Sequence, residues 1–145
     1  MTETTITQPD DLLPNAFGKR ILVVDDVPLV CKVVENQLKA AGFENVASET
    51  NPRLVMDLIS DFKPDMILLD ILMPEISGIE LLKQIRSNPE LDQIIVLMLS
   101  AAGRDEQFES LELGALGFMQ KPITAIDFVQ TVTGKFCLAK RLGIQ

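Results

Sequence analysis

The chain has 145 residues, of which 47% are hydrophobic and 23% charged, so it can bury one domain-sized core but not two. Its formal net charge of −8 argues against direct binding to nucleic acid or to an anionic membrane surface. The sequence contains no histidine, which excludes Ser-His-Asp and Cys-His catalysis, His-ligated metals and a phosphohistidine carrier.

Predicted strands and helices alternate along the chain. Residues 1–17 have no periodicity and are predicted to be a mobile tail, which leaves a domain at 18–143. Short apolar runs predict strands at residues 21–24, 46–49, 66–69, 94–99 and 116–119. Helical spacing follows at about 28–41, 51–62, 79–87, 104–113 and 124–142. This alternation with short connections predicts a mainly parallel α/β sheet with helices on both faces.

Several of these helices carry boundary and burial signals. Pro28 suits a first helical turn, and Gly42 suits the position just after a helix. The residues expected on buried helix faces include Val30, Val33, Val34, Leu38, Ala41, Leu54, Val55, Leu58, Ile59, Phe62, Phe108, Leu111, Ile126, Val129, Val132, Phe136 and Leu138.

The run at 66–69 ends in a carboxylate, Asp70, and Pro74 and Gly78 follow. A short apolar run bounded by turn residues predicts a strand buried on both faces. An unpaired charge is unfavourable inside that layer, so Asp70 is expected where the strand leaves the core. Ligands of open parallel sheets bind at this end of the strands, which makes Asp70 a candidate functional residue.

Four of the five predicted strands end in polar residues that suit one chemistry. They deliver Asp25 and Asp26, Asp70, Ser100 and Lys121 to what should be one edge of the sheet. Carboxylate oxygens without His or Cys suit a hard cation such as Mg²⁺. A lysine and a hydroxyl are natural partners of phosphoryl oxygens. Together these residues indicate transfer of a phosphoryl group onto Asp70.

Each of these residues also has a purely structural interpretation. Asp25 or Asp26 could cap the following helix, Asp70 could be a solvated strand end, Ser100 a turn residue and Lys121 a surface residue. The functional interpretation is preferred because four independent coincidences would otherwise be needed.

The remaining sequence features place the protein in the cytoplasm. Cys31 and Cys137 lie far apart in helical segments and fit neither a disulfide framework nor a zinc site, so both are expected to be small core side chains. No apolar run approaches transmembrane length, and residues 1–10 are polar and acidic, unlike a secretory signal.

In these motifs the sequence resembles the response-regulator receiver domains of two-component signalling, of the chemotaxis-regulator type. The matching pieces are Ile-Leu-Val-Val-Asp-Asp (21–26), Pro-Asp-Met-Ile-Leu-Leu-Asp-Ile-Leu-Met-Pro (64–74) with Gly78, Leu-Ser-Ala (99–101) and Gly-Phe-Met-Gln-Lys-Pro (117–122). The likeness covers about residues 18–142. It implies a flavodoxin-like, doubly wound sheet of five parallel strands in the order 2-1-3-4-5 with five helices.

The resemblance also implies a metal site. Asp70 would be the phosphoacceptor, taking its phosphoryl group from a phosphohistidine or a small phosphodonor. Asp26, Asp70 and the backbone carbonyl of Leu72 would bind Mg²⁺, with Mn²⁺ as an alternative, and Asp25 would reach the ion through water. The domain would catalyse only its own phosphorylation and dephosphorylation, so it would not be an enzyme in the ordinary sense.

Further residues would bind the phosphoryl group and respond to it. Ser100, the backbone N–H of Ala101 and Lys121 would contact the phosphoryl oxygens. Phe118 matches the aromatic residue that turns inward when the hydroxyl is drawn to the phosphate. Pro122 matches the position of a cis peptide bond. The surface of the fourth helix, fifth strand and fifth helix would then change its conformation.

The sequence departs from the commonest receiver pattern at four positions. Ser100 replaces a frequent threonine and Phe118 a frequent tyrosine. Leu72 and Ala102 occupy positions that tune hydrolysis in this family, and neither side chain can hydrogen-bond a water molecule. We therefore hypothesise a long-lived phosphoryl-Asp70.

The implied partners are a sensor histidine kinase or phosphotransfer protein, a downstream protein or fused output domain, and a second copy of the phosphorylated chain. The fourth helix carries Glu106, Glu109 and Glu112 at helical spacing, which reads as a solvated face or as a partner-selecting acidic stripe.

Three alternatives remain open from the sequence. A phosphatase of the haloacid dehalogenase type would need a second aspartate two residues after the nucleophile, where this chain has Leu72. A degenerate receiver would lack acidic-pocket residues that are present here. The chain could also be the N-terminal receiver of a longer regulator.

Overall fold

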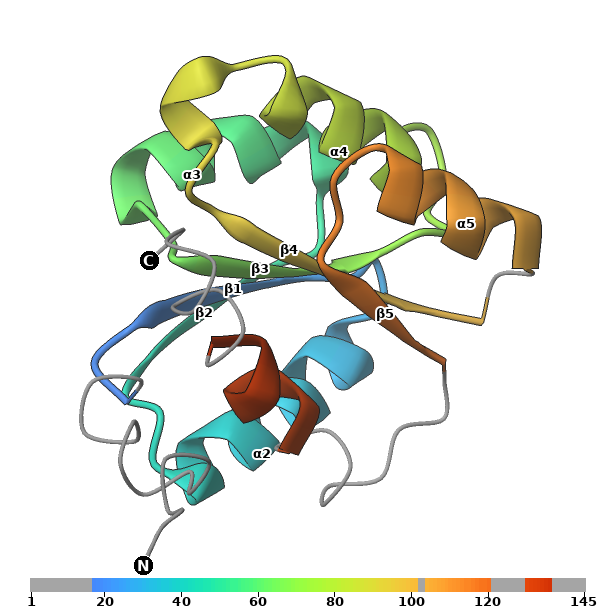
Figure 1. Ribbon diagram of the computed structural model, residues 1–145. Coiled ribbons are helices and arrows are strands. Elements are labelled where there is room, and N and C mark those ends of the chain that lie inside the picture. Colours follow the sequence, from blue (N-terminus) through green and yellow to red (C-terminus); the bar gives the residue numbers. More distant parts are fainter. Residues whose placement is uncertain (1–16, 102–103, 121–129, 137–145) are drawn as a thin grey trace, which may run out of the picture.

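The computed structural model describes residues 17–101, 104–120 and 130–136. Its strands form one parallel sheet in the order β2-β1-β3-β4-β5, as predicted (Figure 1). They are β1 (Arg20–Val24), β2 (Asn45–Glu49), β3 (Met66–Asp70), β4 (Ile95–Ser100) and β5 (Gly117–Gln120). The edge strand β2 is polar and only partly buried, whereas every residue of the central strand β3 is buried.

Helices cover both faces of the sheet, as predicted. They are α2 (Pro28–Ala41), α3 (Val55–Phe62), α4 (Gly78–Arg86), α5 (Arg104–Glu112) and a helical segment at residues 130–136. Figure 1 shows α3, α4 and α5 on one face, and α2 with residues 130–136 on the other. Among the described residues no helix has the length and apolar character needed to cross a membrane.

The predicted boundaries of α2 are confirmed. Pro28 is its first residue, and Gly42 ends it with a φ of 116° and a backbone N–H bonded to the carbonyls of Leu38 and Lys39. The residue that precedes the helix as its N-cap is Val27, and no side chain caps it. Asp25 and Asp26 are therefore not N-cap residues.

Some predicted core positions are wrong. The buried side chains of α2 are Cys31, Val34 and Leu38, and Val33 is 45% exposed because it lies about 100° around the helix from Val34. Leu54 is 48% exposed because Pro52–Leu54 form a separate 3-10 turn, η3, before α3 begins. Of the last predicted helix, Val132 and Phe136 are buried, and Ile126, Val129 and Leu138 lie outside the described residues.

The helix α5 has an unexpected orientation. Its buried side chains are polar, Gln107 and Ser110, whereas Phe108 and Leu111 are 56% and 37% exposed. Ser110 donates a hydrogen bond to the backbone carbonyl of Gln107 at 2.7 Å, which satisfies its buried hydroxyl. The apolar residues of this helix therefore contribute to the surface and not to the core.

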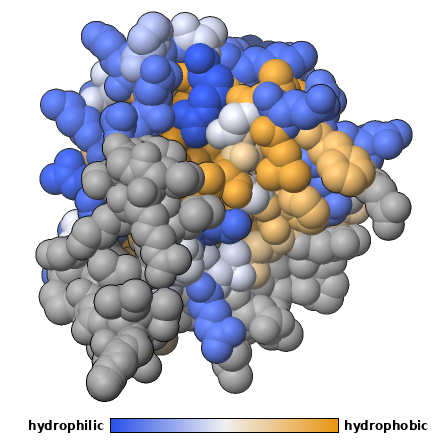
Figure 2. Space-filling model, viewed as in Figure 1, coloured by the Kyte–Doolittle hydropathy of each residue, from blue (hydrophilic) through white to orange (hydrophobic). Residues whose placement is uncertain are grey.

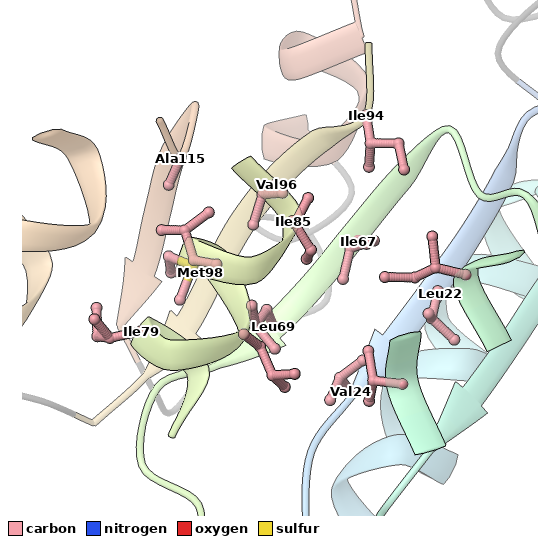
Figure 3. Packing of buried hydrophobic residues seen from close by; sticks show 14 of the residues in the cluster. Leu22, Val24, Ile67, Leu69, Ile79, Ile85, Ile94, Val96, Met98 and Ala115 are labelled. Atoms are coloured by element: carbon pink, nitrogen blue, oxygen red, sulfur yellow. The ribbon is translucent and has the colours of Figure 1, made fainter. Parts of the chain in front are cut away.

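Two apolar clusters sandwich the sheet because successive strand residues point to opposite faces. In β1, Ile21 and Val23 face α2, whereas Leu22 and Val24 face α3 and α4. Figure 3 shows side chains of β1, β3 and β4 meeting those of α4 in the second cluster. This burial holds the carboxyl ends of the central strands in a fixed arrangement.

An arginine joins the connections on the α4 side of the sheet. Arg86, the last residue of α4, donates to the carbonyls of Leu91 at 3.3 Å, Ile94 at 2.7 Å and Gly114 at 3.1 Å. Burial lowers the pKa of Arg86 from its usual value, but a guanidinium remains charged at any ordinary pH. The side chain thus ties the end of α4 to the turns before β4 and β5.

The start of α4 lies directly against the end of β3. Ser77 and Glu80 form a capping box, and the Gly78 N–H donates to the carbonyl of Ile71 at 2.8 Å. A Cβ atom on Gly78 would lie 2.0 Å from the carbonyl oxygen of Asp70. Only glycine allows this close approach of the two backbones.

Replacing Gly78 with alanine is expected to lower the free energy of unfolding by about 1–3 kcal/mol, because the backbone at Asp70 must move to make room. Urea unfolding followed by circular dichroism measures this change. The matched control is Gly134→Ala in the helical segment, where a Cβ meets nothing within 4 Å. That control should raise stability by about 0.5–1 kcal/mol. A similar effect of both substitutions would contradict the proposed contact.

Candidate functional site

Three carboxylates gather at the carboxyl end of the sheet. Asp25 and Asp26 directly follow β1, and Asp70 is the last residue of β3. The two strands are parallel neighbours with Val24 level with Leu69, so their carboxylates emerge side by side. One oxygen from each of the three lies within 4.8 Å of the others. Asp25 and Asp70 are only 2% and 4% exposed, and Asp26 is half-buried.

Backbone and side-chain contacts hold Asp25 in place. Its N–H donates to the carbonyl of Glu49 at 3.3 Å, and its Oδ1 accepts from the N–H of Val27 at 2.9 Å. Its carbonyl accepts a bond from Cys31 Sγ at 3.4 Å. Burial, followed by the negative charge of Asp25, raises the pKa of the Cys31 thiol. Cys31 is therefore a neutral core side chain, as predicted, and not a reactive thiol.

The donor set of this cluster fits a hard divalent cation. Buried carboxylates repel one another, and a bound cation removes that repulsion. One oxygen of each carboxylate lies within 4.8 Å of the other two, so a single cation could be reached by all three, directly or through water. We conclude that Asp25, Asp26 and Asp70 could hold Mg²⁺.

The other predicted site residues are only partly described. Ser100 ends β4 one residue beyond Leu99, which is level with Asp70, so its backbone lies at the same edge. Ala101 follows it and is exposed, as is Leu72 at 56%. Phe118, in β5, is 37% exposed. Ala102, Lys121 and Pro122 lie outside the described residues.

Sequence reasoning missed an ion pair near this edge. Arg53 Nε lies 3.0 Å from Glu75 Oε1, and Glu75 adopts a φ of 70°. The two residues are 22 positions apart. No local pattern could have paired them, because their approach depends on the order of the strands.

Comparison with known proteins agrees with this geometry. Residues 21–133 match the family model of the response regulator receiver domain. The phosphate regulon transcriptional regulatory protein PhoB of Pseudomonas aeruginosa is 36% identical over 113 residues, which cover 77% of this chain and 49% of PhoB. The chemotaxis protein CheY of Thermotoga maritima is 35% identical over 117 residues, which cover 80% of this chain and 96% of CheY.

A solved structure supports the same likeness. The signal receiver domain of a signal transduction histidine kinase from Syntrophus aciditrophicus has a TM-score of 0.76 and 29% sequence identity. The match covers 86% of this chain and 94% of that one. The chain thus spans about half the length of PhoB but nearly all of CheY and of this receiver domain.

If the cluster binds Mg²⁺, the ion should stabilise the fold. At ten times its Kd, Mg²⁺ is expected to add about 1.4 kcal/mol to the free energy of unfolding. Asp26→Asn should lose most of this Mg²⁺-dependent increase. In the absence of metal, the variant should be more stable than the wild type, because one repelling charge is gone. Urea unfolding at constant ionic strength measures both effects.

The matched control is Asp61→Asn, which removes an exposed carboxylate of α3. This variant should keep the full Mg²⁺-dependent increase. An equal loss in both variants would show that the ion acts through general charge screening and not through the cluster.

Proposed function

The chain belongs to the response regulator receiver domain family, and we propose that it is a signalling switch that accepts a phosphoryl group on Asp70 from a histidine kinase. The observation that carries this proposal is the gathering of Asp25, Asp26 and Asp70 at the end of β1 and β3. Family membership also argues against the phosphatase alternative, which would need an aspartate at the position of Leu72.

In the proposed reaction an oxygen of the Asp70 carboxylate attacks the phosphorus of a phosphohistidine. The new O–P bond forms as the N–P bond breaks. The electron pair of the broken N–P bond stays on the imidazole nitrogen. Asp70 is buried at the end of a strand that lies between β1 and β4, which limits the paths by which a phosphodonor can approach it. The product is a mixed anhydride of Asp70 and phosphate.

Mg²⁺ would be held by Asp26, Asp70 and the Leu72 carbonyl, with Asp25 reaching it through water. When bound, this ion supplies positive charge that balances the carboxylates and the incoming phosphoryl oxygens. From the family resemblance, Ser100, the Ala101 N–H and Lys121 would hold those oxygens. The backbone of Ser100 lies at the correct edge for this role.

The proposed output surface comprises α5, β5 and the last helix, which are the fourth helix, fifth strand and fifth helix of the family. Figure 2 shows an apolar patch over α5 and β5, and the exposed apolar residues there are Phe108, Leu111 and Phe118. Large apolar side chains exposed together are typical of an interaction site. Phosphorylation would shift this surface between two populations through Ser100 and Phe118.

The proposed partners follow from the family: a kinase or phosphotransfer protein upstream, and a target protein, output domain or second copy of the chain downstream. We propose that the protein acts in the cytoplasm. Because the chain spans 49% of PhoB, a transcriptional regulatory protein, a role as the receiver of a longer regulator is a second proposal.

Phosphorylation is tested by intact mass after incubation with Mg²⁺ and acetyl phosphate. The wild type is expected to gain one phosphoryl group, and Asp70→Asn none. Asp61→Asn, on the exposed side of α3, should gain it as the wild type does. A labelled Asp70→Asn protein, or an unlabelled wild type, would refute the assignment of the acceptor.

The lifetime of phosphoryl-Asp70 is expected to be long, because Leu72 offers no side-chain hydrogen bond to an attacking water molecule. Leu72→Asn should shorten the lifetime several-fold, and since Leu72 is 56% exposed this substitution should leave the core intact. The decay of the phosphorylated mass after removal of the donor measures it. A wild-type lifetime of seconds that Leu72→Asn leaves unchanged would contradict the hypothesis.

A further inference from the structure

We infer that the ion pair between Arg53 and Glu75 positions the loop that follows the phosphoacceptor and thereby raises the affinity of the site for Mg²⁺. This inference rests on the proposed function of Asp70. Arg53 Nε and Glu75 Oε1 are 3.0 Å apart, which is hydrogen-bond distance as well as ion-pair distance.

The ion pair connects the segments that follow β2 and β3, the two strands on either side of β1. Arg53 lies in η3, just after β2, and Glu75 lies in the loop between β3 and α4. The sheet order is β2-β1-β3, so this bond joins the connections on either side of the strand that delivers Asp25 and Asp26. The pair therefore belongs to the same edge of the sheet as the carboxylate cluster.

Hydrogen bonds hold the backbone of the turn that carries Arg53, whose side chain is itself 66% exposed. The Asn51 side chain accepts the Arg53 N–H at 3.0 Å, and the Glu49 carboxylate accepts the N–H groups of Thr50 and Asn51 at 3.1 and 3.0 Å. The carbonyl of Glu49 in turn accepts the N–H of Asp25. The turn that carries Arg53 is thus linked through Glu49 to Asp25 of the acidic cluster.

The Glu75 end of the bond lies in a loop with an uncommon backbone. Glu75 has a φ of 70°, in the left-handed region that residues other than glycine rarely adopt. The Gly78–Ile71 hydrogen bond closes the base of this loop, and the ion pair fixes its outer part. Leu72, whose carbonyl is the proposed metal ligand, lies between these two attachments. Fixing Glu75 therefore restricts the positions that the Leu72 carbonyl can take.

A positioning role and a simple effect of charge predict changes of opposite sign in Mg²⁺ affinity when Arg53 is removed. Through its electrostatic field alone, Glu75 would favour a bound cation and Arg53 would oppose one. If the pair instead positions the loop, loss of either partner weakens Mg²⁺ binding. The two explanations therefore predict opposite results for the arginine.

The test compares Arg53→Gln, Glu75→Gln and the exchanged pair Arg53→Glu with Glu75→Arg. Both single variants are expected to weaken Mg²⁺ binding about two- to five-fold, the range for an exposed ion pair. The exchanged pair should recover most of the affinity. Mg²⁺ titration followed by the backbone amide signals of Asp70 and Leu72 measures the binding.

Hydrogen exchange of the backbone amides of Leu72, Met73, Glu75 and Ile76 in metal-free protein gives a second, independent readout. Exchange should be faster in both single variants and near wild type in the exchanged pair. Lys39→Gln is the matched control, because it removes one exposed positive charge of α2 that forms an ion pair with the partly buried Glu35 at 4.0 Å. That control should change neither readout.

Tighter Mg²⁺ binding by Arg53→Gln, or unchanged exchange in the single variants, would overturn the inference. If the wild type bound no Mg²⁺, the proposed function would fail. Faster exchange in both single variants would then still establish the pair as the element that holds the loop.

Discussion

The parallel pairing of β1 with β3 brings like charges together, and the rest of the structure depends on this constraint. Main-chain hydrogen bonds set Val24 level with Leu69, so Asp25 and Asp70 must emerge as neighbours. Their mutual repulsion is tolerated because two apolar clusters fix the strands from both faces. The energy of core burial is thus used to hold three carboxylates close together, which is the donor set that we propose for a hard cation.

Short-range patterns were sufficient to predict a parallel α/β sheet and the acidic cluster at its edge, whereas the strand order was implied by the family resemblance. An apolar run that ends in Asp70 defines a buried strand and its exit, and Gly42 and Pro28 define the ends of α2. Predictions of burial were less successful. Val33 and Leu54 are exposed because a small rotation about a helix, or one 3-10 turn, changes the direction of a side chain. The contact between Arg53 and Glu75 was beyond sequence reasoning, because even a correct strand order does not place two exposed side chains of separate loops within bonding distance.

The helix α5 combines weak anchoring with an apolar surface. Its inward side chains are the polar Gln107 and Ser110, so little apolar area holds it to the sheet. Polar contacts from α4 add to the attachment: Arg86 donates to the carbonyl of Gly114, just after the helix, and Lys83 lies 3.9 Å from Glu109 in its middle. A helix held in this way can shift without opening the core, which is consistent with the proposed role of α5 in the output surface.

The polar edge strand β2 also has a consequence for self-association. An edge strand can act as a template for adding strands from other molecules, and the tendency grows when the strand is long and apolar. Among the described residues β2 is one of the two edge strands. Here the edge has five residues, with Asn45, Ser48 and Glu49 among them. Glu49 already accepts hydrogen bonds from the turn that follows it. A short, polar edge strand of this kind makes the addition of a further strand less favourable.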